Sequence, residues 1–123
     1  MSNSAGLFSS SLGRKYLMAL TGLFLCSFLL IHLLGNVALF TDPVQFNEYT
    51  RFMSSNPIIR VMEIILVLGF LTHIVDAVML SKANKAAQPV KYAMDRKQSS
   101  WYSRNMGLTG SIILAFLILH YFF

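Results

Sequence analysis

The sequence predicts an all-α membrane protein with three transmembrane helices joined by two connections. Of its 123 residues, 55% are apolar and only 12% are charged, whereas a soluble domain carries about a quarter charged residues. The mean hydropathy of the chain is +0.59. A spanning helix needs about 20 mainly apolar residues, and the chain contains three apolar stretches of about that length. Little of the protein is therefore expected outside the bilayer.

The shortage of charge also excludes several classes of protein. The chain has 10 basic and 5 acidic residues and a net charge of +5. These charged residues are too few for a disordered chain or for one that binds nucleic acid. Cys26 is the single cysteine, so an internal disulfide and a cysteine-rich zinc motif are both excluded.

The first predicted span covers residues 16–40, after Arg14 and Lys15 and before the turn at Thr41-Asp42-Pro43. A signal peptide is the weaker alternative for this segment, because the apolar run is too long and no small-residue cleavage site follows it.

Two further spans are predicted at residues 57–81 and 104–123. Pro57 suits the first turn of a helix because its φ is fixed and it lacks an N–H. An outer loop, 41–56, and a basic loop, 82–103, connect the three spans, and residues 1–123 form a single transmembrane domain.

The basic residues predict the orientation of these spans. Cytoplasmic loops carry an excess of Lys and Arg, so the N-terminus and loop 82–103 are expected in the cytoplasm, and loop 41–56 and Phe123 outside. The protein is then a multi-pass protein of the inner (cytoplasmic) membrane. Eight of the ten basic residues lie on the cytoplasmic side in this arrangement: Arg14, Lys15, Lys82, Lys85, Lys91, Arg96, Lys97 and Arg104.

Each predicted span contains one histidine: His32, His73 and His120. An ionisable residue within a membrane indicates a functional site, although a histidine can also merely bond across a helix interface. At a rise of about 1.5 Å per residue, His32 and His120 both lie about 24 Å from the cytoplasmic ends of their spans. His73 lies about 24 Å into a helix that runs the other way, and so nearer the inner face.

Two imidazoles at one depth predict a pair of axial ligands for haem. The haem macrocycle is apolar and its iron takes axial protein ligands, whereas zinc needs three or four converging ligands, usually with Cys or carboxylate among them. Two axial nitrogens leave the iron no open position, which favours electron transfer. The sequence therefore predicts a membrane b-type cytochrome in which His32 and His120 bind haem b.

The ordered set of histidines and their flanks resembles the cytochrome b subunit of succinate dehydrogenase or fumarate reductase. The likeness covers residues 11–120 and is greatest to the single-chain, two-haem cytochromes b558 of Bacteroidetes-like bacteria. It is carried by the following segments: Phe28 to Leu33, Phe46 to Tyr49, Arg51 to Met53, Pro57 to Glu63, Leu71 to His73, and Arg104 to Gly110 leading to His120.

This resemblance implies a five-helix, haem-binding bundle, of which the chain would be the first part. It implies that His32 and His120 hold the outer haem iron, and that His73 holds an inner haem iron whose second ligand is missing from this chain. Two further helices would then follow Phe123. The implied partners are a flavoprotein subunit, an iron–sulfur subunit and quinone.

Four further polar features admit two interpretations. Arg60 and Glu63 can form an ordinary interfacial ion pair, or Glu63, like Glu48, can relay protons to quinone. Asp76 can orient a nearby imidazole or basic residue, or it can be a solvated acid at the inner surface, and the second is favoured. The hydroxyl groups in the spans can bond back to helix carbonyls or touch haem; they belong to Ser27, Thr72, Thr109 and Ser111.

The function expected from these observations is that of a haem-bearing membrane anchor of respiratory complex II. The anchor would pass electrons between the iron–sulfur subunit and quinone, and dicarboxylate chemistry would belong to the partner subunits, because the chain has no flavin motif and no cysteine cluster. The alternative is a non-haem membrane adaptor or assembly protein whose histidines only pack helices. A transporter is weaker still, because broken helices and internal symmetry are not evident.

Overall fold

The computed structural model describes residue 6, residues 9–87 and residues 100–123. Every regular element in these ranges is a helix, so the all-α prediction is confirmed. The chain divides into two units, Met1–Pro89 and Val90–Phe123, which are described separately below.

The first unit begins with helix α1, Ser11–Val37. Its N-cap is Ser10, whose Oγ accepts a hydrogen bond of 3.0 Å from the backbone N–H of Gly13, as expected for a serine at this position. A short 3₁₀ helix, η1 (Ala38–Phe40), continues from α1. The predicted span 16–40 is thus helical throughout, and the helix starts five residues earlier, at Ser11.

Helix α2, Pro43–Ser55, occupies the predicted outer loop and was not expected from the sequence. Asp42 caps it, because its Oδ1 accepts a bond of 2.8 Å from the N–H of Val44. Pro43 stands in the first turn, where its missing N–H costs nothing. The Asp-Pro pair therefore starts a helix as well as ending the preceding segment.

Helix α3, Pro57–Ala87, extends six residues past the predicted end of the second span. Asn56 caps it through Oδ1, which accepts from the N–H of Ile58 at 2.9 Å. Its last turns carry Lys82 and Lys85, and no proline occurs in the helix after Pro57. Polar residues such as lysine have good helix propensity, so the end of the apolar run did not end the helix.

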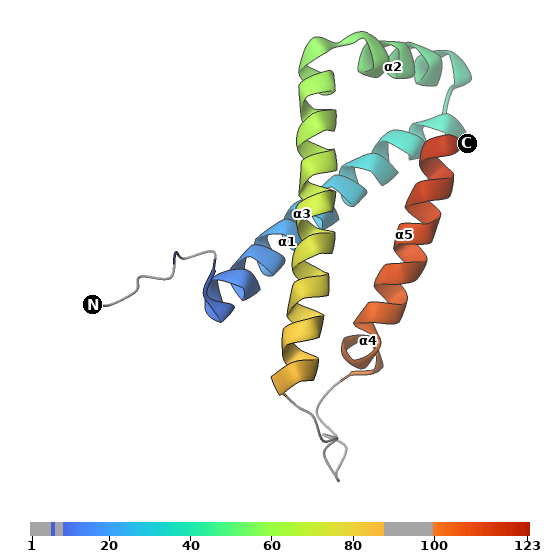
Figure 1. The fold of residues 1–123 in the computed structure, drawn as a ribbon. Coiled ribbons are helices and arrows are strands. Elements are labelled where there is room, and N and C mark those ends of the chain that lie inside the picture. The colour runs from blue at the N-terminus through green and yellow to red at the C-terminus, as the bar shows by residue number, and fades with distance from the viewer. Residues whose placement is uncertain (1–5, 7–8, 88–99) are drawn as a thin grey trace. The chain divides into compact units, whose positions relative to one another are not determined.

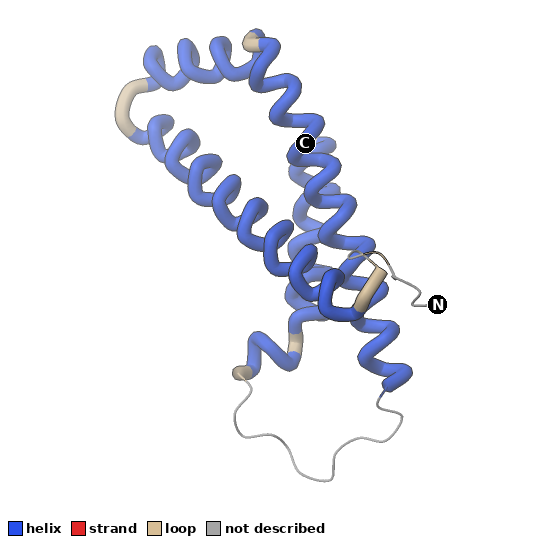
Figure 2. Tube along the Cα trace, turned by 90° about the vertical axis from the view of Figure 1, so that its left-hand side faces the viewer, coloured by secondary structure: helices blue, strands red, loops and turns tan. Residues whose placement is uncertain are grey.

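Within the first unit, α1 and α3 run in opposite directions and cross, and α2 joins the ends that lie beyond the crossing (Figure 1). Figure 2 shows the two helices moving apart toward α2. Leu25 of α1, only 7% exposed, is the one buried apolar side chain among the described residues. The unit is therefore an open arrangement of helices with a narrow seam of contact.

The second unit contains α4, Trp101–Arg104, and α5, Met106–Phe122. Asn105 separates them with φ −111° and ψ 23°, and its N–H bonds the carbonyls of Trp101 and Tyr102. These bonds end α4 after a single turn, before α5 begins. The third predicted span, 104–123, is accordingly a shorter helix of 17 residues. Of the described helices, two and not three are long and apolar enough to cross a bilayer.

The apolar side chains of both long helices are largely uncovered. Only 6% of the most apolar window of each helix is buried, whereas the core helix of a soluble protein is mostly buried. Soluble monomers rarely expose apolar patches larger than a few hundred Å². The apolar surfaces of α1 and α3 are thus left largely uncovered by the described part of the chain. The basic residues Lys91, Arg96 and Lys97 of the predicted cytoplasmic loop lie outside the described residues.

Candidate functional site

His73 lies at the seam between α3 and α1, where it is half-buried. Its Nδ1 lies 2.8 Å from Oγ1 of Thr21 on α1. A Cβ added at Gly22 would stand 3.5 Å from Cε1 of the same imidazole, in ordinary van der Waals contact. The ring therefore contacts α1 through Thr21 and lies next to Gly22, which leaves room for it.

The tautomer of His73 is coupled to the hydrogen of the Thr21 hydroxyl. This hydroxyl has one hydrogen and three acceptors within 3.2 Å, namely the carbonyls of Leu17 and Met18 and Nδ1 of His73. When the hydroxyl donates to its own helix, Nδ1 of His73 donates to Thr21 Oγ1, and the neutral ring presents an unprotonated Nε2. A hydrogen bond on one ring nitrogen sets the tautomer and prepares the other nitrogen to bind a metal.

Small residues allow the close approach of the two helices at this seam. Gly69 lies one turn from His73 on α3, and a Cβ placed there would come within 2.7 Å of Phe24 Cε1. Close approach over glycine is a common basis of helix packing in membranes. The sequence gave no signal that singled out Thr21.

His32 and His120 share a local arrangement although they lie in different units. His32 stacks on Phe28, with ring centroids 5.2 Å apart and an interplanar angle of 25°. His120 stacks on Phe116 at 5.4 Å and 15°. Both imidazoles lie on exposed parts of their helices. Their pairing across the two units stays a prediction.

The stacking has a sequence signal that the spacing analysis missed. Residues 28–32 read FLLIH and residues 116–120 read FLILH. Residues four apart share one face of a helix, so each phenylalanine supports the imidazole one turn later. His73 differs, because Gly69 stands at the corresponding position and its support comes from Thr21 instead.

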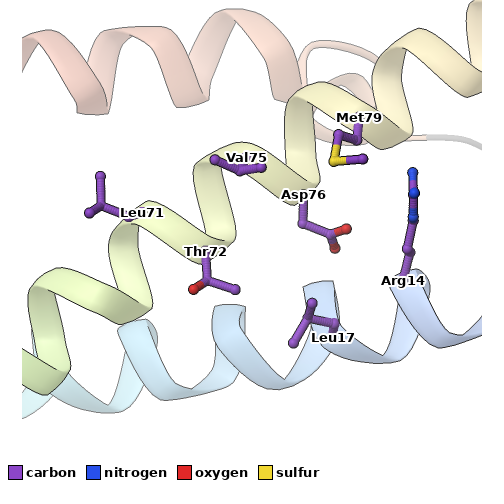
Figure 3. Close-up of a pocket in the computed structure, with 7 residues that line it drawn as sticks. All are labelled: Arg14, Leu17, Leu71, Thr72, Val75, Asp76 and Met79. Carbon is purple, nitrogen blue, oxygen red and sulfur yellow. The ribbon is translucent and has the colours of Figure 1, made fainter. Parts of the chain in front are cut away.

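Asp76 is buried, and the prediction of a solvated acid was wrong. It is 5% exposed, and its Oδ2 has no hydrogen-bond partner within residues 9–87 and 100–123. It also does not orient His73, whose Nδ1 bonds Thr21. Asp76 faces a cavity of about 400 Å³ between α1 and α3, which Arg14 and Thr72 also line (Figure 3).

Arg60 and Glu63 form the ion pair that their spacing predicts, with Nη1 2.8 Å from Oε2. Arg60 also donates from Nη2 to the carbonyl of Ser54 at 2.9 Å, which ties the end of α2 to the start of α3. Both side chains of the pair are more than half exposed. Glu48 lies on α2 and is exposed as well. The proposed role of Glu48 and Glu63 in proton transfer stays a prediction.

The hydroxyl groups in the apolar helices donate to the carbonyl four residues before them, as one of the two interpretations expected. This bonding satisfies the hydroxyl within its own helix. The bonds are Ser27 to Leu23 at 2.9 Å, Thr72 to Leu68 at 2.8 Å, Thr109 to Asn105 at 3.2 Å and Ser111 to Gly107 at 2.7 Å.

Comparison with known proteins adds no relative to this description. The chain matches no family model, no curated protein and no solved structure. The functional interpretation therefore depends on the residues themselves.

Proposed function

We propose that the chain is a haem b-binding membrane anchor of a succinate dehydrogenase or fumarate reductase. The proposal rests on three histidines within apolar helices, and above all on His73, whose Nδ1 contact with Thr21 suits a metal-binding imidazole. The uncovered apolar surfaces of α1 and α3 support a membrane location. In this proposal the third histidine helix, α5, also spans the bilayer, and the N-terminus is cytoplasmic.

Each histidine has a definite task in this proposal. His32 and His120 bind one haem iron from two helices, and Phe28 and Phe116 hold their rings by stacking. His73 binds a second haem iron together with a histidine from outside this chain. Bound haem supplies one-electron transfer between the iron–sulfur subunit and quinone. The anchor is thus an electron-transfer subunit, and partner subunits carry out the dicarboxylate chemistry.

In this proposal, carboxylates on α2 and α3 transfer protons to and from quinone. Glu48 and Glu63 are exposed carboxylates on these two helices. A buried or lipid-facing quinone needs nearby groups that exchange protons with water, and intramembrane acids commonly do this. Arg60 holds the Glu63 carboxylate in place through its 2.8 Å contact.

A reduced-minus-oxidised absorption spectrum of the purified chain tests the proposal. We expect the bands of a six-coordinate b-type haem, and we expect them to disappear in the His32→Ala and His120→Ala variants. His73→Ala should leave this haem in place, because His73 belongs to the other pair. Ser111→Ala is a matched control on α5, since its hydroxyl only bonds its own helix. A well-folded chain without these bands would instead favour the adaptor function.

A further inference from the structure

We propose that the cavity between the N-terminal turns of α1 and the C-terminal half of α3 binds the headgroup of a phospholipid with a primary ammonium group, such as phosphatidylethanolamine. The inference rests on the proposed membrane location of the chain. It concerns a site away from the histidines, and it does not depend on haem.

The carboxylate of Asp76 is the first reason for a ligand at this place. Its side chain is 5% exposed, and Oδ2 has no hydrogen-bond partner among the residues that the structure describes. A buried acceptor without a partner is destabilising, and unsatisfied buried groups are rare in folded proteins. A ligand that donates a hydrogen bond to Oδ2 would remove this cost.

Arg14 is the second reason, because it offers the opposite charge in the same cavity. Figure 3 shows Arg14 reaching in from α1 and Asp76 reaching in from α3. Within the described residues, the ion pair between Arg60 and Glu63 is the only one, so Arg14 and Asp76 share the cavity without pairing. A ligand that carries both charges can occupy the space between them.

The rest of the lining fits a lipid rather than a small polar ion. The cavity has a volume of about 400 Å³, within the usual size range for ligand sites, and it is a largely open depression. Four of its seven lining residues are apolar and can contact acyl chains: Leu17, Leu71, Val75 and Met79. Lys82, the first residue of the predicted basic loop, lies six residues beyond Asp76 on α3, a rise of about 9 Å. In the proposed membrane location, this spacing places the cavity close to headgroup level.

The chemistry of the two charged residues selects the headgroup. A phosphate suits the guanidinium of Arg14, which binds such groups through paired N–H donors. A primary ammonium group can donate an N–H to Asp76 Oδ2, whereas the quaternary ammonium of phosphatidylcholine has no N–H to donate. Phosphatidylglycerol has a phosphate, and its hydroxyl groups can donate a hydrogen bond to Asp76, but it has no cation to balance the carboxylate. Of these three lipids, phosphatidylethanolamine alone offers a phosphate for Arg14 together with a positively charged N–H donor for Asp76.

Native mass spectrometry of the full chain in detergent tests this inference with three lipids of identical acyl chains. We expect phosphatidylethanolamine to bind about tenfold tighter than phosphatidylcholine, because a charge-assisted hydrogen bond contributes about 1.5 kcal/mol or more. Asp76→Asn should abolish this preference. Arg14→Gln should weaken the binding of all three lipids. Lys82→Gln and Glu48→Gln are controls, since each removes one charge outside the cavity.

Three results would overturn the inference. The first is equal binding of the three lipids by the original chain, and the second is an unchanged preference in Asp76→Asn. The third is a strong coupling between Arg14→Gln and Asp76→Asn in the unfolding of lipid-free protein, which would show that Arg14 itself pairs with Asp76. Circular dichroism establishes that each variant is folded. A haem spectrum without a lipid preference rejects the lipid site alone, and a lipid preference without haem rejects the proposed function alone.

Discussion

Replacing Thr21 by valine tests the seam between α1 and α3. Valine has nearly the shape of threonine but no hydroxyl, so Nδ1 of His73 loses the contact at 2.8 Å. Polar contacts between membrane helices contribute about 0.6 kcal/mol on average, and an unpaired buried group costs about 1–3 kcal/mol. Because His73 is half-buried, we expect Thr21→Val to lower the free energy of unfolding by about 1 kcal/mol.

The measurement is unfolding in a denaturing detergent, followed by circular dichroism. A double-mutant cycle with His73→Phe should give a coupling of about 1 kcal/mol between the two side chains. Thr21→Ser keeps the hydroxyl and should retain most of the stability. Thr72→Val is the matched control, because the Thr72 hydroxyl donates only to Leu68 of its own helix.

Nitrogen NMR of labelled His73 examines the same contact without unfolding. In the haem-free chain we expect Nδ1 to be protonated and Nε2 unprotonated, and we expect this preference to weaken in Thr21→Val. The reasoning is refuted if Nε2 carries the proton in the original chain, or if Thr21→Val costs no more stability than Thr72→Val and shows no coupling to His73.

Three further predictions concern the cap of α2, its junction with α3, and the orientation of the chain in the membrane. Asp42→Ala should lower the free energy of unfolding by about 1 kcal/mol, because it removes the N-cap of α2. Asp42→Asn keeps a side-chain acceptor and should retain most of the stability. Equal stability of the Asp42→Ala and Asp42→Asn variants would contradict the capping role. Arg60→Gln should cost less than about 1 kcal/mol, since its pair with Glu63 is exposed, and the cost should fall in high salt; a salt-independent cost would argue against the pair. In a variant without the native cysteine, Asn47→Cys should react with an impermeant thiol reagent from outside the cell and Ala86→Cys should not; the reverse pattern would invert the predicted topology.

The helical elements of the chain were largely predictable from the sequence. Long apolar runs become helices because backbone groups must bond internally where water is absent, and Pro57 marked the start of α3 correctly. The ends were less predictable. The polar residues after Ser81 continue α3 to Ala87, and Asn105 shortens the last helix to Met106–Phe122, because helix ends depend on local capping rather than on hydropathy.

Helix α2 was missed because its residues carry no long apolar run. Its signal was the Asp42-Pro43 pair, which matches the N-cap and first-turn preferences of helices. In the same way, burial of Asp76 depends on contacts between α1 and α3 that no local pattern encodes. The histidines were visible because imidazoles are rare in apolar segments, whereas Thr21 resembles any other threonine in a helix until its partner on α3 is known.

The junction of α2 and α3 has a mechanical consequence. Asn56 is the single residue between the two helices, and it is fixed by its own cap while Arg60 reaches back to Ser54. We therefore expect the junction to be stiff, so that α2 and α3 move together. A change in the tilt of α2 should then also tilt α3 and shift the imidazole of His73 with it.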